Sequence, residues 1–255
     1  MPPKFLYNIK NKRILSLCYF IWRKYIYIMG LYNKSKISSH FDIPIIINNR
    51  NRLTFLQQLI TALEIRGYKN IHIIDNNSNY KPLLEFYNNC PYNIFRLDEN
   101  IGSLALWQTK IYKQFFNDYY VYTDSDVVPA QDCPHNFLQV FHEKMKIDKS
   151  VMKVGLGLKI DNLPDCYSRK NEVLKWEKQF NESLTSDGYY NAIVDTTFAL
   201  YRPFVSQGAS SLKMLRSQHP YMAHHMPWYN DCNNLDSEEI FYVSNARTDT
   251  HWTSN

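Results

Sequence analysis

Residues 119–129 read Tyr-Tyr-Val-Tyr-Thr-Asp-Ser-Asp-Val-Val-Pro, and the rest of the chain is interpreted around this stretch. Its first half is apolar, β-branched and aromatic, which predicts a buried β-strand. Asp124 and Asp126 end that strand, and in an extended chain their side chains point to the same side. Two neighbouring carboxylates repel each other unless a cation lies between them, and oxygen ligands favour Mg²⁺ or Mn²⁺. The sequence therefore predicts a divalent metal site here. The alternative is a solvated Asp-Ser-Asp turn.

The composition disfavours disulfide-rich, zinc-binding and nucleic-acid-binding proteins. The 255 residues are 45% hydrophobic, which is enough for one sizeable core. Five cysteines lie far apart without a C-x-x-C pair, which indicates reduced thiols of a cytoplasmic protein rather than a disulfide framework or a zinc site. Residues 1–40 contain eight Lys or Arg and no Asp or Glu, which leaves 21 basic against 24 acidic residues in the remainder. A general nucleic-acid binder would carry its basic surface on the folded domain, so this class is disfavoured.

Residues 12–31 are predicted to form a basic, aromatic-rich helix. A helix spanning a membrane would place Arg23 and Lys24 near the bilayer centre, at about 2.5–3.5 kcal/mol each. A signal peptide would need an uninterrupted apolar core and a small-residue cleavage site, which this segment lacks. Two interpretations remain open. Residues 1–36 lie on an anionic membrane surface, which would make the protein peripheral at the inner face of a membrane, or the helix packs its apolar face on the domain.

Strands and helices alternate through the first half of the chain. The predicted strands are 43–47, 71–75, 93–97 and the segment before Asp124, and the predicted helices are 53–66, 82–89 and 104–116. This alternation predicts a doubly wound α/β sheet. Ligands bind beyond the carboxyl ends of such strands, and polar residues follow each strand here. The predicted crevice therefore contains Arg50, Arg52, Asp75, Asn100, Asp124 and Asp126.

The predicted crevice lacks the glycine signatures of other nucleotide sites. No G-x-G-x-x-G follows the first strand and no G-K-[ST] occurs in the chain. Phosphate would then be held by the metal and by basic side chains, for which Arg50 and Arg52 are candidates. The alternative is that both arginines belong to a solvated loop. Asp75 could accept hydrogen bonds from a ribose or a base edge, or it could be a turn residue.

Four motifs in order resemble one enzyme family. They are Pro-Ile-Ile-Ile-Asn-Asn-Arg-Asn-Arg (44–52), Ile-Ile-Asp-Asn-Asn-Ser (73–78), Asn-Ile-Gly (100–102) and Tyr-Thr-Asp-Ser-Asp (122–126). Together they resemble a GT-A glycosyltransferase, and are most similar to family-2-like bacterial enzymes that build surface polysaccharides. The resemblance covers residues 42–255 and implies a Rossmann-like, mainly parallel sheet flanked by helices. It implies one catalytic domain, with a donor half (42–130) and an acceptor half (131–255), while the basic arm 1–41 lies outside it.

The resemblance also implies roles for individual residues. Asp75 would contact the nucleoside, and Asp124 and Asp126 would bind Mn²⁺ or Mg²⁺ on the diphosphate of a UDP- or GDP-sugar. Asn48 joins Arg50, Arg52 and Asn100 among the donor-side candidates. On these grounds Asp126→Ala is expected to abolish transfer and leave the fold intact.

The second half is expected to bind the acceptor. It contains predicted strands at 154–161 and 193–202, with Asp195 in the second, and a predicted helix at 170–180. Residues 221–229 are dense in aromatics and histidines, and aromatic faces stack on sugar rings. We therefore predict that His224, His225 and Trp228 contact a glycan or lipid-linked acceptor. The alternative is a buried structural loop with hydrogen-bonded histidines.

Sugar transfer also needs a base that deprotonates the acceptor hydroxyl. Family-2-like inverting enzymes have an acidic pair, often Glu-Asp, near the start of a late helix. Glu238 and Glu239 occupy this place, after an expected cap at Ser237, and their Glu-Glu sequence departs from that pattern. Asp195 and Asp231 are the alternative bases. Acidic residues in a first helical turn can also simply complement the helix dipole.

Three alternative functions remain. Several GT-A enzymes, chiefly retaining ones, complete the metal shell with a histidine near the C-terminus, so His251 could be a metal ligand of a retaining enzyme. It could equally belong to a solvated tail. A sugar-nucleotidyltransferase would need a glycine-rich loop where this chain has Asn-Asn-Arg-Asn-Arg at 48–52. A non-catalytic scaffold is disfavoured by the intact Asp-Ser-Asp motif and the late acidic pair.

Overall fold

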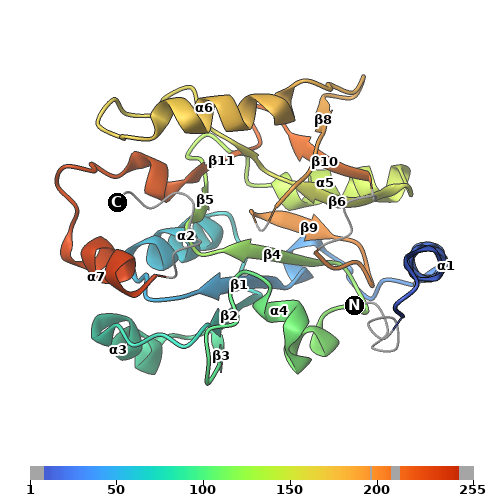
Figure 1. Cartoon of the computed structure of the whole chain (residues 1–255), viewed down its shortest axis with the longest axis horizontal. Helices are drawn as coiled ribbons and strands as arrows, with labels where there is room; N and C mark the ends of the chain where they lie inside the picture. The colour runs from blue at the N-terminus through green and yellow to red at the C-terminus, as the bar shows by residue number, and fades with distance from the viewer. Residues whose placement is uncertain (1–8, 196, 208–212, 247–255) are drawn as a thin grey trace.

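The computed structural model describes residues 9–195, 197–207 and 213–246, and its centre is an eight-stranded sheet (Figure 1). The strand order is β3-β2-β1-β4-β9-β6-β10-β8. The bounds are β1 (Ile45–Asn49), β2 (Ile71–Asp75), β3 (Asn93–Arg96), β4 (Tyr120–Asp124), β6 (Val151–Gly155), β8 (Tyr189–Asn191), β9 (Ala199–Tyr201) and β10 (Lys213–Ser217). A three-stranded sheet has the order β5 (Val127–Pro129), β11 (Met222–His225) and β7 (Gly157–Leu158).

Strands β3, β2, β1 and β4 run parallel. Residues of β1 alternate between two cores, because successive side chains of a strand point to opposite faces. Ile45 and Ile47 join the core cluster that includes α2 and α5, whereas Ile46 joins the one that includes α4. Helices therefore cover both faces of the sheet. The predicted mixed, mainly parallel α/β sheet flanked by helices is confirmed.

Most of the predicted helices are present. The α-helices are α1 (Lys12–Tyr32), α2 (Thr54–Ile65), α3 (Lys81–Asn89), α4 (Ala105–Gln108), α5 (Phe137–Ile147), α6 (Lys170–Lys178) and α7 (Ser237–Asn245). The 3₁₀ helices are η2 (His40–Asp42), η3 (Lys110–Gln114), η4 (Gln179–Asn181) and η5 (Met226–Tyr229). Within the described residues, none of these helices combines the length and the apolar character needed to cross a bilayer.

Some local predictions were wrong. The single helix expected at 104–116 breaks at Thr109, which has extended backbone angles and whose side chain bonds to both flanking turns. The expected strand 193–202 shortens to β9, and α5 and β10 were not anticipated. The N-cap of α7 is Asp236, not Ser237, because the Asp236 carboxylate accepts a hydrogen bond from the Glu239 amide at 2.8 Å.

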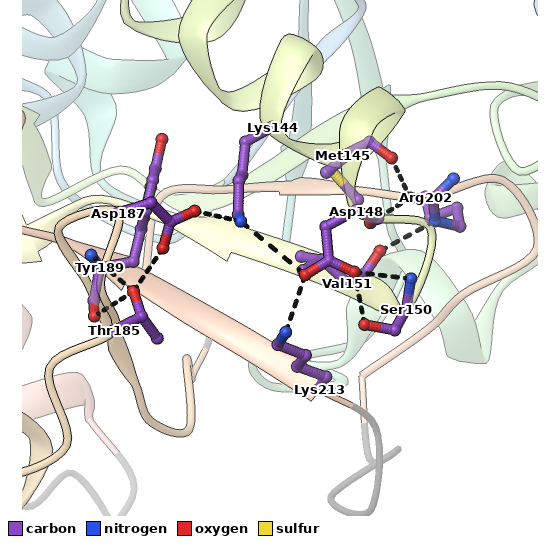
Figure 2. Close-up of polar contacts among 10 residues, drawn as sticks. All are labelled: Lys144, Met145, Asp148, Ser150, Val151, Thr185, Asp187, Tyr189, Arg202 and Lys213. Carbon is purple, nitrogen blue, oxygen red and sulfur yellow. Dashed lines mark hydrogen bonds and ion pairs between the residues drawn. The ribbon is translucent and has the colours of Figure 1, made fainter.

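A polar cluster fastens the end of α5 to the sheet (Figure 2). The buried Arg202 guanidinium donates to the carbonyls of Met145 and Val151. Asp148 follows α5, and its carboxylate accepts a hydrogen bond from Lys213 Nζ at 2.7 Å. Lys144 lies 3.8 Å from the same carboxylate. The cluster thus joins the end of α5 to β6, to β10 and to the residue that follows β9.

Candidate active site

The carboxyl ends of β1, β2 and β4 bring the predicted donor-side residues together. The parallel register places Asn49 beside Asp75 and Asn48 beside Asp124. Asn48 Nδ2 donates to Asp124 Oδ1 at 3.3 Å. The chain leaves β1 toward β2 and β3 and returns to β4 on the other side of β1, so the strand order reverses at this point. Such a switch point is where open α/β sheets bind ligands.

Asp124 and Asp126 lie at a tight turn between two strands. Strand β4 ends at Asp124, residues 125–126 form the turn, and β5 follows. The extended geometry assumed from the sequence therefore stops at Asp124. The Asp126 carbonyl accepts a hydrogen bond from the Met226 amide at 2.8 Å. This bond holds the turn against the start of η5, between the predicted acceptor residues His224 and His225 of β11 and Trp228 of η5.

Arg52 lies buried between two carboxylates. Its guanidinium forms ion pairs with Asp126 and with Glu239, and Arg52 Nη2 donates to Glu239 Oε2 at 3.0 Å. The ring of Tyr242 stacks on it, 3.7 Å from Arg52 Cζ to the ring centroid. From the sequence, Arg52 was a candidate to hold donor phosphates or else part of a solvated loop. In the structure its side chain is buried and its guanidinium pairs with two carboxylates of the protein. Tyr242 was missed, although it follows Glu239 at a helical spacing of three residues, which places both on one face of α7.

Burial and charge in this cluster shift the pKa values of its side chains. Burial alone would lower the pKa of Arg52, but Asp126, Tyr242 and Glu239 outweigh it and raise that pKa, so the guanidinium stays charged. Burial raises the pKa of Glu239, and Arg52 opposes the rise. Burial lowers the pKa of His225, although Asp126 Oδ1, 4.0 Å from its Nε2, favours the charged form.

Glu238 and Glu239 are neighbours with different partners. Glu238 Oε1 accepts hydrogen bonds from the amides of Leu53 and Thr54 at 2.8 and 2.9 Å, and its Oε2 accepts from Thr54 Oγ1 at 3.0 Å. Leu53 is the N-cap residue of α2 and has an apolar side chain, so α7 supplies the cap that α2 lacks locally. Glu238 thereby joins two helices, while Glu239 faces Arg52.

The other donor-side candidates have hydrogen-bond or ion-pair partners within the protein. Asp75 is 1% exposed, and its carboxylate accepts from the Ser78 amide at 3.3 Å and lies 3.4 Å from Arg96 Nε. The contact with the Ser78 amide is the kind expected if Asp75 is a turn residue. Arg50 Nη1 donates to the carbonyl of Asn245, the last residue of α7, at 2.9 Å. Asn100 Oδ1 accepts from the Gly102 amide at 3.0 Å.

Two asparagines that the sequence interpretation overlooked shape this edge. Asn51 has a positive φ of 54°, and its Oδ1 accepts from the amides of Asn79 and Tyr80 at the start of α3. Asn76 Oδ1 accepts from the Ile101 amide, and its Nδ2 donates to the Gly102 carbonyl. Asparagine tolerates left-handed backbone and bonds to nearby main chain, so asparagines after strands were a usable signal.

The acceptor-side candidates separate into two groups. Strand β11 brings His225 next to Asp126, while the His224 ring packs 4.8 Å from that of Tyr229. Trp228 is 2% exposed and packs against His225, so in this conformation its ring face belongs to the core. Asp195 is exposed on another segment, where its carbonyl accepts from the buried Lys153 Nζ at 2.6 Å.

Two acidic or metal candidates remain, Asp231 and His251. Asp231 Oδ1 accepts from the Asn233 amide at 2.9 Å, within a loop. His251 lies outside the described residues. Among the residues that are described, no group of three or more His, Cys, Asp or Glu is arranged to hold a metal ion.

The residues present nevertheless suit a substrate-borne cation. Mg²⁺ characteristically takes one or two protein carboxylates and completes its shell with water and substrate phosphates. Asp124 and Asp126 are both partly exposed at the switch point. Asp126 turns one oxygen to Arg52 and the other toward His225. This donor set of two carboxylates fits a divalent cation that arrives with a diphosphate.

Comparison with known proteins gives structural similarity alone. No family model matches the chain, and no curated protein matches its sequence. Similar solved structures include S. aureus TarS 1–349 (12% identity, TM-score 0.46, 79% of this chain covered), and GalNAc-T7 with UDP, GalNAc and Mn²⁺ (14%, 0.45, 71%). A third is glucosyl-3-phosphoglycerate synthase from Mycobacterium tuberculosis with Mn²⁺ and UDP-Glc (9%, 0.40, 71%).

The matched region spans 62%, 42% and 60% of the length of those three chains. At these identities and TM-scores the similarity concerns the course of the chain, and the chemistry of the site is inferred from its own residues. In sheet order and helix placement, the chain has a mixed α/β arrangement, with a large, mainly parallel sheet flanked by helices.

Proposed function

We propose that this protein is a metal-dependent glycosyltransferase that moves a sugar from a nucleotide-diphosphate sugar to a hydroxyl of a glycan or lipid-linked acceptor, with inversion. The observation that carries the proposal is the link between Asp126 and Glu239. Arg52 joins the metal-binding candidate to the base candidate at the switch point of the sheet. We assign catalysis to residues 42–255, with donor and acceptor halves meeting at residue 130.

Asp124 and Asp126 would hold Mn²⁺ or Mg²⁺ on the donor diphosphate. The cation would neutralise charge that develops on the leaving diphosphate. Asn48 donates to Asp124 and Arg52 pairs with Asp126, so the chain itself orients both carboxylates before a donor binds. Such preorganisation lowers the cost of reaching the reactive geometry.

Glu239 is proposed as the base. The acceptor oxygen forms a bond to the anomeric carbon while the bond from that carbon to the diphosphate oxygen breaks. The diphosphate leaves with the electron pair, and the hydroxyl proton passes to the Glu239 carboxylate. Burial favours the protonated form of Glu239, which helps it to receive the proton, and Arg52 fixes its orientation. Glu238 is disfavoured as the base because both its oxygens cap α2.

The test compares Glu239→Gln with Glu238→Gln in the full chain. Thermal shift with Mn²⁺ and UDP-, GDP- or dTDP-sugars first identifies the donor, since binding to the native state raises the melting temperature. Glu239→Gln should still bind that donor but turn over about 10²–10⁴-fold more slowly, the usual range for loss of a general base. Glu238→Gln should keep most of the turnover.

Near-normal turnover of Glu239→Gln would reject it as the base. The anomeric configuration of the product, read by NMR, separates the two stereochemical alternatives. Retention would reject the inverting mechanism and favour the retaining one, in which His251 is a metal ligand.

A further inference from the structure

Helix α1 presents a continuous apolar stripe to solvent. The stripe consists of side chains spaced three or four residues apart, namely Ile14, Leu17, Ile21, Tyr25, Ile28 and Tyr32. Each is between 48% and 82% exposed. Residues at this spacing lie on one face of a helix. Contiguous exposed apolar surface of this kind marks an interaction site.

The helix is attached to the body near its C-terminal end. Gly30 is buried, and a Cβ placed there would lie 3.2 Å from the Arg202 side chain. Just after the helix, Asn33 Nδ2 donates to the Asn117 carbonyl at 2.8 Å, and Ser35 Oγ donates to Asp118 at 2.6 Å. These contacts hold the opposite side of α1 at one end, so the packing-helix interpretation describes only a small part of the helix.

The charges on α1 indicate what covers the stripe. Arg13 lies four residues before Leu17 and Lys24 three residues after Ile21, so both border the stripe. No acidic residue occurs before Asp42. A helix with an apolar face, aromatic side chains and a purely basic border suits the interface of an anionic bilayer, in which the cations meet lipid phosphates. We propose that α1 docks this protein on an anionic lipid surface by lying in its headgroup region.

A second copy of the chain is the competing occupant, because a stripe with this spacing also suits a coiled coil. Helices that pair in this way usually carry opposite charges beside the stripe. Here each copy would bring Arg13 and Lys24 and no compensating acidic side chain from α1. This like-charge repulsion favours the lipid surface.

The proposed docking surface goes beyond the proposed catalysis and is remote from it. Figure 1 places α1 and α7 at opposite ends of the molecule, and Glu239 lies on α7. Changes on the stripe should therefore leave the candidate active site undisturbed. Vesicle binding can also be measured without an enzymatic assay.

The experiment is co-sedimentation of the full chain with vesicles of phosphatidylcholine, with and without phosphatidylserine. The stripe variant is Ile14→Gln with Ile21→Gln. Its matched control is Ile65→Gln with Ile147→Gln, which makes the same change at isoleucines that are 65% and 83% exposed elsewhere. Because all four sites are exposed, each protein should keep its melting temperature.

The intact chain should bind the phosphatidylserine vesicles and be released by salt. Binding of the stripe variant should fall about tenfold or more, and the control should bind like the unaltered chain. A charge variant, Arg13→Gln with Lys24→Gln, should also bind about tenfold or more weakly.

Failure of the intact chain to bind either vesicle would overturn the proposal, as would a stripe variant that binds normally. Analytical ultracentrifugation gives the remaining test. A dimer that Ile14→Gln with Ile21→Gln dissociates would assign the stripe to a second copy and would also overturn it.

Discussion

Arg52 and Glu239 form a two-point ion pair between the loop after β1 and the first turn of α7. Arg52 Nη2 donates to Glu239 Oε2 at 3.0 Å, and Arg52 Nε lies 3.0 Å from Oε1. The two residues are 3% and 5% exposed, and 187 positions separate them in the chain. The pair fixes the base candidate relative to the β1 loop, and through Asp126 relative to the metal candidate.

Arg52→Ala should destabilise the protein strongly. It would leave the buried Glu239 and the partly buried Asp126 without their cation, and breaking a buried pair in this way costs about 3–5 kcal/mol. Urea denaturation of the free protein would measure this loss. Arg96→Ala is the control, because its side chain is 59% exposed where it pairs with Asp75. Unchanged stability of Arg52→Ala with weaker donor binding would restore the phosphate role that the sequence suggested.

Glu238→Ala should destabilise α2, although the substitution lies on α7. It removes the acceptor for the amides of Leu53 and Thr54, and loss of an N-cap costs about 0.5–2 kcal/mol. Glu172→Ala is the matched control, since Glu172 also lies in a first helical turn and pairs with its own helix's N-cap residue, Arg169. Equal losses of unfolding free energy in the two variants would argue against the cap.

Asp124→Asn is the cleanest test of the metal site. The asparagine Oδ1 can still accept from Asn48, so the melting temperature without ligand should hold. The extra stabilisation by Mn²⁺ with a nucleotide-sugar should disappear, as should turnover, and a chelator should have the same effect on the unaltered protein. Full Mn²⁺-dependent stabilisation of the variant would reject Asp124 as a ligand.

Asp126→Ala tests the metal site less directly than the sequence alone indicated, because the substitution also removes an ion pair. Asp126 pairs with the buried Arg52, so its removal should lower stability as well as activity. Comparison of its melting temperature with that of Asp124→Asn checks this. An unchanged melting temperature would return Asp126 to the purely catalytic role expected from the sequence.

Asp148→Asn should remove a pH-dependent contribution to stability (Figure 2). Hydrogen bonds from Lys213 and then Ser150 lower the pKa of Asp148 below its usual 3.8. A carboxyl with a lowered pKa stabilises the fold fully above its unfolded pKa and loses that contribution as the pH falls. The variant should lose about 1 kcal/mol at neutral pH, and the difference should shrink below pH 3.8. Asp165→Asn, whose side chain is 99% exposed, should change little at either pH.

His142→Phe should reduce the acid sensitivity of the fold. Burial, followed by Lys146, lowers the pKa of His142 from 6.5 to about 4. Between these values the unfolded chain binds a proton that the folded chain does not, so stability falls as the pH drops from 6.5 to about 4. Denaturant melts across this range should show a shallower loss in the variant. Parallel curves for both proteins would contradict the shift.

Local pattern determined the fold class and the metal candidates. Continuous apolar, β-branched and aromatic runs ending in polar residues identified β1 (Ile45–Asn49) and β4 (Tyr120–Asp124), because a strand that is covered on both faces needs apolar side chains at successive positions. Asp124 and Asp126 were predicted as metal ligands from their position at the end of that same strand. At Thr109 the apolar pattern predicted one continuous helix. The hydrogen bonds of the Thr109 side chain instead end α4 and begin η3, so the predicted helix was too long.

The pairing of the site residues was decided by tertiary structure. Glu238 and Glu239 are adjacent, and nothing local distinguishes them, yet one caps α2 and the other holds Arg52. The sequence likewise made Arg52 a candidate to bind a phosphate, whereas in the structure Glu239 and Tyr242 of α7 contact its guanidinium. Such contacts join residues more than 180 positions apart, so they depend on how the helix packs against the sheet and not on periodicity along the chain. The sequence thus specified which chemical groups the site contains, and the packing of α7 specified which of them meet.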